Sequence, residues 1–157
     1  MPAVRLGYPA TRRLRDSASF ALFTSSARES GAGATGRWWR GGRRWLSVAA
    51  LINPRDAAVG TARMPCRFGV TVGKRNAARS VDRSLIKRVL REAARHAAPG
   101  LDAAAAARMV QLDVVLRLKA PVPAPGTLPR ARLKRELRAE ADTLLDRLAH
   151  SLSSSPT

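Results

Sequence analysis

Apolar and polar positions alternate along several segments of the chain in the way that β-strands require. Every second residue of the range 110–118 is apolar, which is typical of a strand with one buried face. Residues 67–73 alternate in the same manner, and residues 45–52 are rich in β-forming side chains. Five glycines fall within residues 31–42, where we expect a loop or a strand-loop-strand connection. The pattern therefore predicts a small sheet.

A period of 3.6 residues replaces this alternation in three other segments. It predicts a short helix from Ser17 to about Ala27 and a long helix from Ser80 to Ala98, ended by Pro99-Gly100. The last helix extends to about His150, and its predicted buried stripe is Leu133, Leu137, Ala141, Leu144 and Leu148. The predicted order is α-β-β-β-α-β-α, an α+β fold in which helices cover a small sheet.

Length and composition narrow the class of protein. The 157 residues, of which 45% are hydrophobic, suffice for one domain, which we place at residues 8–150 between flexible tails at 1–7 and 151–157. Twenty-nine residues are alanine and only 4% are aromatic, so the predicted core is small. The formal net charge is +18, because 29 Lys and Arg outnumber 11 Asp and Glu. This balance disfavours an enzyme for small neutral substrates and makes nucleic acid the leading partner.

Cysteine usage and hydropathy bear on the compartment. Cys66 is the single cysteine, so neither an intrachain disulfide nor a zinc site is expected, which favours a reducing compartment and most simply the cytoplasm. The chain has no stretch of about 18 apolar residues that could span a bilayer. The first 15 residues carry four arginines and lack the apolar centre of a secretory signal, while an organellar transit peptide stays open as an alternative.

The long helix predicted from Ser80 to Ala98 has one apolar face and one cationic face. On a helical wheel five cations fall within about 140° of one another, opposite Leu85, Ile86, Val89, Leu90 and Ala93. We call these cations, together with one that precedes the helix, the cationic ladder: Arg79, Arg83, Lys87, Arg88, Arg91 and Arg95. Like charges four residues apart repel each other, so the ladder is explained if phosphates complete it. The alternative is a solvated face in an arginine-rich proteome.

The positive charge is concentrated in the first part of the chain. Residues 1–95 carry 20 basic and 5 acidic residues, whereas residues 96–157 carry 9 and 6. Lys74 and Arg75 lie between the strand predicted at 67–73 and the long helix, whose N-terminus adds unpaired N–H groups. We therefore expect the strand end, the basic turn and the ladder to form one continuous anion-binding surface.

The residues argue against a self-sufficient protein active site. A protein nuclease needs clustered carboxylates for metal ions or a histidine acid–base pair. The eleven acidic residues are scattered, and His96 and His150 lie near predicted helix ends, where a positive charge suits the helix dipole. Four acidic residues of the last helix are expected to form a solvated face beside arginines: Glu136, Glu140, Asp142 and Asp146. No catalytic or metal-ligating residue is therefore predicted.

The range 67–92, RFGVTVGKRNAARSVDRSLIKRVLRE, resembles the protein subunit of bacterial ribonuclease P. That family pairs an Arg-x-Gly strand ending in Lys-Lys with a helix that bears Arg-Asn-Arg, an apolar residue, Lys-Arg, two further residues and Arg-Glu. The matching places are held here by Arg83, Ile86, Lys87, Arg88, Arg91 and Glu92. Ser84 and Leu85 depart from the motif. Residues 28–45, rich in Gly, Arg and Trp, resemble an expansion relative to the family.

The resemblance implies a ribosomal-protein-S5-like α+β fold with a left-handed βαβ crossover. It also implies a subunit that joins a catalytic RNA, whose bound Mg²⁺ supports the cleavage of 5′ leaders from precursor tRNA. By position, Arg83, Lys87, Arg88 and Arg91 would contact the catalytic RNA. The residues expected near the single-stranded leader are Phe20, Phe68, Val70, Lys74 and Arg75.

Alternatives to this function remain open from the sequence. One is a ribosomal or ribosome-assembly RNA-binding protein with a related fold, and another is a nucleoid-type DNA binder, although neither a helix-turn-helix nor a dimer seam is recognisable. Trp38 and Trp39, flanked by arginines, could stack on bases or cap the core.

Overall fold

The computed structural model describes residues 13–14, 23, 36–55, 66–124 and 126–154. Within these residues the chain forms strands β1 (Arg37–Gly42), β2 (Leu46–Pro54) and β3 (Cys66–Thr71), helix α3 (Ser80–Ala107), strand β4 (Val110–Leu118) and helix α4 (Arg130–Ser154). This order confirms the α+β class. The helix predicted from Ser17 to about Ala27, with Phe20, lies outside the described residues.

The four strands form one mixed sheet in the order β1-β2-β4-β3. The pairs β1–β2 and β2–β4 are antiparallel, whereas β3 and β4 are parallel and are connected by α3. Parallel neighbours need such a long crossover because the chain has to return to the starting edge. The left-handed sense of this crossover stays a prediction. Leu14 extends the sheet beyond β3, since its N–H donates to the Phe68 carbonyl at 2.9 Å.

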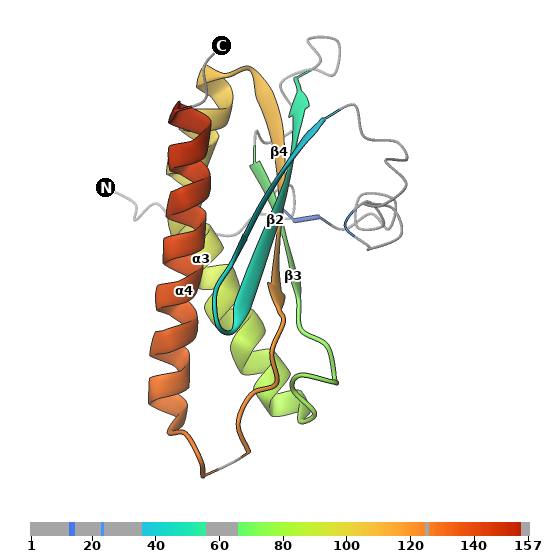
Figure 1. Ribbon diagram of the computed structural model, residues 1–157, viewed down its shortest axis with the longest axis vertical. Coiled ribbons are helices and arrows are strands. Elements are labelled where there is room, and N and C mark those ends of the chain that lie inside the picture. The colour runs from blue at the N-terminus through green and yellow to red at the C-terminus, as the bar shows by residue number, and fades with distance from the viewer. Residues whose placement is uncertain (1–12, 15–22, 24–35, 56–65, 125, 155–157) are drawn as a thin grey trace, which may run out of the picture.

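Both helices cover the same face of the sheet, and the core lies between the two layers (Figure 1). Alternate residues of the strands point into this core, among them Val48 and Ala50 of β2 and Val114 and Leu116 of β4. The predicted stripe of α4 is confirmed, because all five of its residues are buried. The opposite sheet face is also partly covered, since Asp113 and Val115 are buried, so β4 does not have the single buried face expected from its alternation.

The prediction that the long helix ends at Pro99-Gly100 is wrong, because α3 continues to Ala107. A proline inside a helix removes one backbone hydrogen bond and costs about 3 kcal/mol. Two features offset this cost. Leu101 and Ala105 are buried in the core, and residues 103–107 are five consecutive alanines, the strongest helix formers.

The glycine-rich range 31–42 contains a strand that the sequence pattern left undecided. Residues 37–42 form β1 at the edge of the sheet, so this part of the segment belongs to the fold rather than to a loop. Gly41 allows β1 to approach α4 closely, because a Cβ atom there would lie 2.8 Å from Cη2 of Trp39 and 3.1 Å from Cδ2 of Leu144. Gly41, one of the glycines that made this segment look like a loop in the sequence, therefore leaves the space that the side chains of Trp39 and Leu144 occupy.

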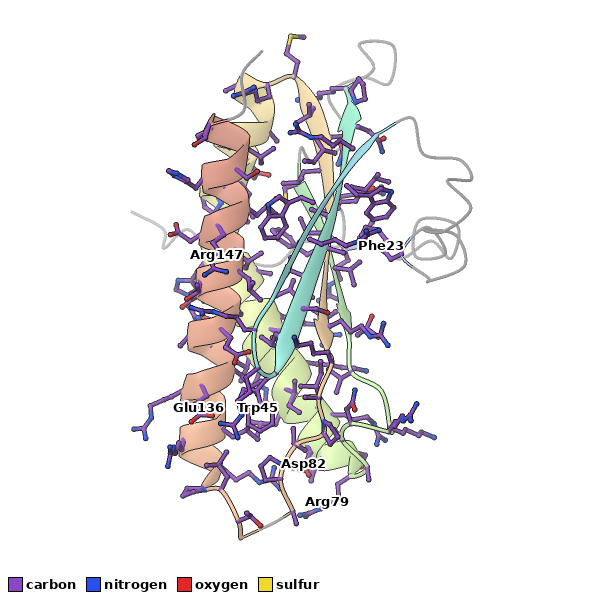
Figure 2. All side chains as sticks on the ribbon, viewed as in Figure 1. Phe23, Trp45, Arg79, Asp82, Glu136 and Arg147 are labelled. Atoms are coloured by element: carbon purple, nitrogen blue, oxygen red, sulfur yellow. The ribbon has the colours of Figure 1, made fainter. Side chains whose placement is uncertain are left out.

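Two of the acidic residues of α4 hold the β1–β2 hairpin, which corrects their assignment to a solvated face. The Glu140 carboxylate accepts hydrogen bonds from the backbone N–H groups of Trp45 and Leu46 at 2.9 and 3.0 Å. Glu136 accepts from Nε1 of Trp45 at 3.0 Å, and Figure 2 shows these two side chains together. These charge-assisted bonds satisfy donors that the hairpin cannot pair itself. Asp142, in contrast, pairs with Arg138 on the surface as expected.

The contact between Glu136 and Trp45 predicts a pH-dependent contribution to stability. The hydrogen bond from the Trp45 ring, followed by that from Arg132, lowers the pKa of Glu136 from its ordinary value of 4.5. A lowered folded-state pKa adds stability that is complete above the unfolded-state pKa and is lost as the pH falls through the folded-state pKa. We expect the unfolding free energy to fall more between about pH 5 and about pH 3 in the wild type than in Glu136→Gln, measured by urea denaturation. Equal losses in both proteins would contradict the contact.

Candidate nucleic-acid interface

Helices α3 and α4 lie side by side and begin at the same end of the molecule (Figure 1). At that end Asp82, in the first turn of α3, forms an ion pair with Arg130, the first residue of α4. At the other end Nη2 of Arg108 donates to the carbonyl of Ser153. The two helices are thus fixed to each other at both ends, and their positive dipole ends point the same way.

The middle of the cationic ladder is accessible and unneutralised. Arg88 and Arg91 are exposed and Lys87 is half-buried, while the core-facing residues of the same helix include Ile86 and Leu90. Within the described residues none of these three cations forms an ion pair with an acidic side chain. The helix therefore presents the separation of apolar and cationic faces that its sequence predicts.

One end of the ladder is neutralised by an acidic neighbour. Nε of Arg95 donates to the Glu92 carboxylate at 3.2 Å, and His96 lies 3.0 Å from the same carboxylate. The bond from Arg95, and then that from His96, lowers the pKa of Glu92. Because Arg95 is already paired in this way, it is a weaker candidate for a phosphate contact than Lys87, Arg88 and Arg91.

Arg83, at the other end of the ladder, is engaged with the backbone of the preceding turn. Its Nη1 atom donates to the carbonyl oxygens of Ala77 and Ala78 at 2.9 and 2.7 Å. A guanidinium group has five N–H donors, so this contact leaves others available. The side chain that we expected only to bind RNA also fixes the turn in front of α3.

That turn displays the predicted basic residues on a rigid base. Nδ2 of Asn76 donates to the Leu118 carbonyl at 3.0 Å, and the Asn76 carbonyl accepts from the N–H of Val122 at 2.9 Å. Lys74 and Arg75, directly before Asn76, are exposed. Arg79 is also exposed and precedes α3 at the end of the molecule where both helices begin (Figure 2). These three exposed cations thus directly precede the helix that carries the rest of the ladder, and one continuous anion-binding surface stays a prediction.

The residues predicted to contact the leader differ in how accessible they are. Phe68 is 1% exposed and its ring lies in the core, so it is not available for stacking, because its position in β3 points it toward the helices. Val70 points to the same side and packs partly against the core. Phe20 lies outside the described residues.

An aromatic group that sequence reasoning left ambiguous lies on the sheet face away from the helices. Trp38 is half-buried there, its ring centroid is 5.1 Å from that of Phe23, and the Arg40 guanidinium lies 5.4 Å from it. Figure 2 shows Phe23 on this side of the sheet. Trp39 points the opposite way and packs against the core, so the two neighbouring tryptophans fulfil different roles. The alternation of a strand is the signal that separates them.

The described residues give no donor set for a metal ion. No three His, Cys, Asp or Glu side chains gather within this part of the chain as a metal site would need. Within the same residues no helix is long and apolar enough to cross a membrane. Of the two residues that depart from the family motif, Ser84 is exposed within the arc of the cations and Leu85 is half-buried on the opposite, apolar face.

The chain is similar to proteins of one known family. The model of the ribonuclease P family matches residues 8–137. The chain is 40% identical over 108 residues to the ribonuclease P protein component of Bordetella avium (strain 197N), covering 69% of this chain and 80% of that protein. It is 37% identical over 92 residues to the ribonuclease P protein component of Ralstonia pickettii (strain 12J), covering 59% and 60%. No solved structure matches significantly. Because the family model spans well over half of its length, the chain belongs to the ribonuclease P protein family.

Proposed function

We propose that this protein binds the catalytic RNA of ribonuclease P and the 5′ leader of precursor tRNA, and so promotes endonucleolytic removal of the leader. The observation that supports this most is the accessible, unneutralised middle of the cationic ladder, formed by Lys87, Arg88 and Arg91. Lys87 and Arg91, four residues apart, repel each other unless anions complete them. The two relatives named above are both ribonuclease P protein components.

The physical task in this proposal is to bring two polyanions together. Catalytic RNA and precursor tRNA repel each other, and cations that neutralise their phosphates lower that barrier. The described residues hold no carboxylate cluster for a metal ion, so Mg²⁺ belongs to the RNA in this proposal and the bond cleavage with it. The protein contributes affinity and placement. The one buried thiol, Cys66, fits a cytoplasmic location, which we propose with this role.

The leader contact in this proposal does not use the ring of Phe68. Since Phe68 lies in the core, the group of Trp38, Phe23 and Arg40 is the stronger candidate for stacking on single-stranded bases. Base–aromatic stacking tolerates any sequence, which suits leaders that differ between tRNAs. Lys74 and Arg75 remain candidates for phosphate contacts because both are exposed.

The test is cleavage of precursor tRNA at low Mg²⁺ concentration by bacterial ribonuclease P RNA. Adding this protein should raise the rate of leader removal by more than tenfold, because the cations replace the counterions that the RNA alone requires. The protein without RNA should release no leader. If the rate stays unchanged although the protein binds RNA tightly, a ribosomal or ribosome-assembly role becomes the better interpretation.

A further inference from the structure

A groove of about 520 Å³ lies between α3 and α4 and borders the cationic ladder, since Arg88 is one of its lining residues. It is lined by Arg88, Val89 and Glu92 of α3 and by Lys134, Arg135, Arg138, Ala139 and Asp142 of α4. Most of its lining residues are charged, while Val89 and Ala139 are apolar. Most of the lining surface is apolar all the same, because the long charged side chains also contribute their aliphatic parts.

The acidic residues of the groove are already satisfied within their own helices. Glu92 accepts from Arg95 and His96, and Asp142 accepts from Nε of Arg138 at 3.0 Å. Three cations remain: Arg88, Lys134 and Arg135. Within the described residues none of the three forms an ion pair. The groove thus presents positive charge from both of its walls.

Lys134 and Arg135 differ from the other cations at the beginning of α4, because no ion pair within the described residues involves them. The first nine residues of this helix carry five cations, and three of these have acidic partners. Arg130 pairs with Asp82, Arg132 with Glu136 and Arg138 with Asp142. Lys134 and Arg135 are exposed and form no such ion pair in the part of the chain that the structure describes. Their position suggests an anion outside the chain.

We propose that this groove binds one sugar-phosphate strand of the catalytic RNA, so that α4 continues the surface that the ladder begins. The inference rests on the proposed function and adds a second helix to it. Cations on both walls can contact phosphates, and the apolar groups of Val89 and Ala139 can contact ribose. Because α3 and α4 are joined at both ends, through Asp82–Arg130 and Arg108–Ser153, the two walls are held in place before RNA binds.

The first test measures how affinity for the catalytic RNA depends on salt. Lys134→Ala with Arg135→Ala should lower the log–log slope by roughly 1.4–1.8, and should weaken binding at least roughly tenfold at moderate salt. The matched control, Arg43→Ala with Arg147→Ala, removes the same charge from exposed positions outside the groove, and Figure 2 shows Arg147 farther along α4. Equal effects of the two double variants would overturn the proposal, because charge alone would then explain the loss.

The second test places a probe in the groove. An iron chelate attached to Ala139→Cys should cleave specific nucleotides of the bound catalytic RNA, while the same chelate at Arg147→Cys should cleave them weakly. The native Cys66 is buried and does not compete for the label. No cleavage from position 139 in a complex that forms normally would overturn the groove and leave the proposed function intact. Failure of the wild-type protein to bind the RNA would instead overturn the proposed function.

Discussion

Replacing Asp113 with alanine should lower the free energy of unfolding by about 3–5 kcal/mol. The Asp113 carboxylate accepts two hydrogen bonds from Arg67, from Nε and Nη2, both at 2.9 Å. The two side chains are only 8% and 9% exposed, and the residues are direct partners across β4 and β3. Without Asp113 the buried guanidinium group would lose both of these charge-assisted hydrogen bonds. Urea denaturation measures the loss.

A double variant separates the loss of the partner from the loss of packing. Arg67→Met with Asp113→Leu removes both charges and keeps most of the volume, and it should be within about 1.5 kcal/mol of the wild type, because burying an ion pair gains little over apolar groups. A cost of less than about 1 kcal/mol for Asp113→Ala alone would contradict a stabilising role of this ion pair. Arg67, the arginine of the Arg-x-Gly strand, therefore has a structural role within the sheet.

The elements of the fold could be predicted where their signal is local. Alternation gave the bounds of β4, and the 3.6-residue period gave the buried stripe of α4. The end of α3 could not be predicted, because Pro99 is tolerated only through the burial of Leu101 and Ala105 by distant segments. The same holds for Glu140, whose hydrogen-bond partner Trp45 is 95 residues away in sequence.

In the candidate site, too, the features with a local sequence signal could be predicted and those that depend on distant contacts could not. Its ladder could be predicted because residues four apart on a helix share a face, and Lys87 and Arg91 are placed as expected. The sequence could not show which of these cations bind other groups of the protein. The carbonyls that accept hydrogen bonds from Arg83 come close to it only once the turn at 74–78 has folded. The groove cations of α4 were missed because the sequence does not show which face of α4 borders α3.

Replacing Lys87, Arg88 and Arg91 together with alanine should lower the salt slope of binding to the catalytic RNA by roughly 2–3, the largest effect expected of any surface variant. The fold should not suffer. Lys87 and Arg91 are four residues apart and repel each other, so their removal should stabilise the helix by a few tenths of a kcal/mol, and alanine is the best helix former. Filter binding across a salt series and thermal unfolding measure the two quantities.

The control for the ladder is Arg43→Ala with Lys119→Ala and Arg147→Ala, three exposed cations that belong to neither the ladder nor the groove. This variant has the same net charge as the ladder variant but should keep most of the wild-type slope, because only cations that contact phosphates release counterions. A ladder variant that binds as steeply as this control would mean that α3 faces water in the complex. In that case long-range attraction by the net charge of +18 would have to account for RNA binding.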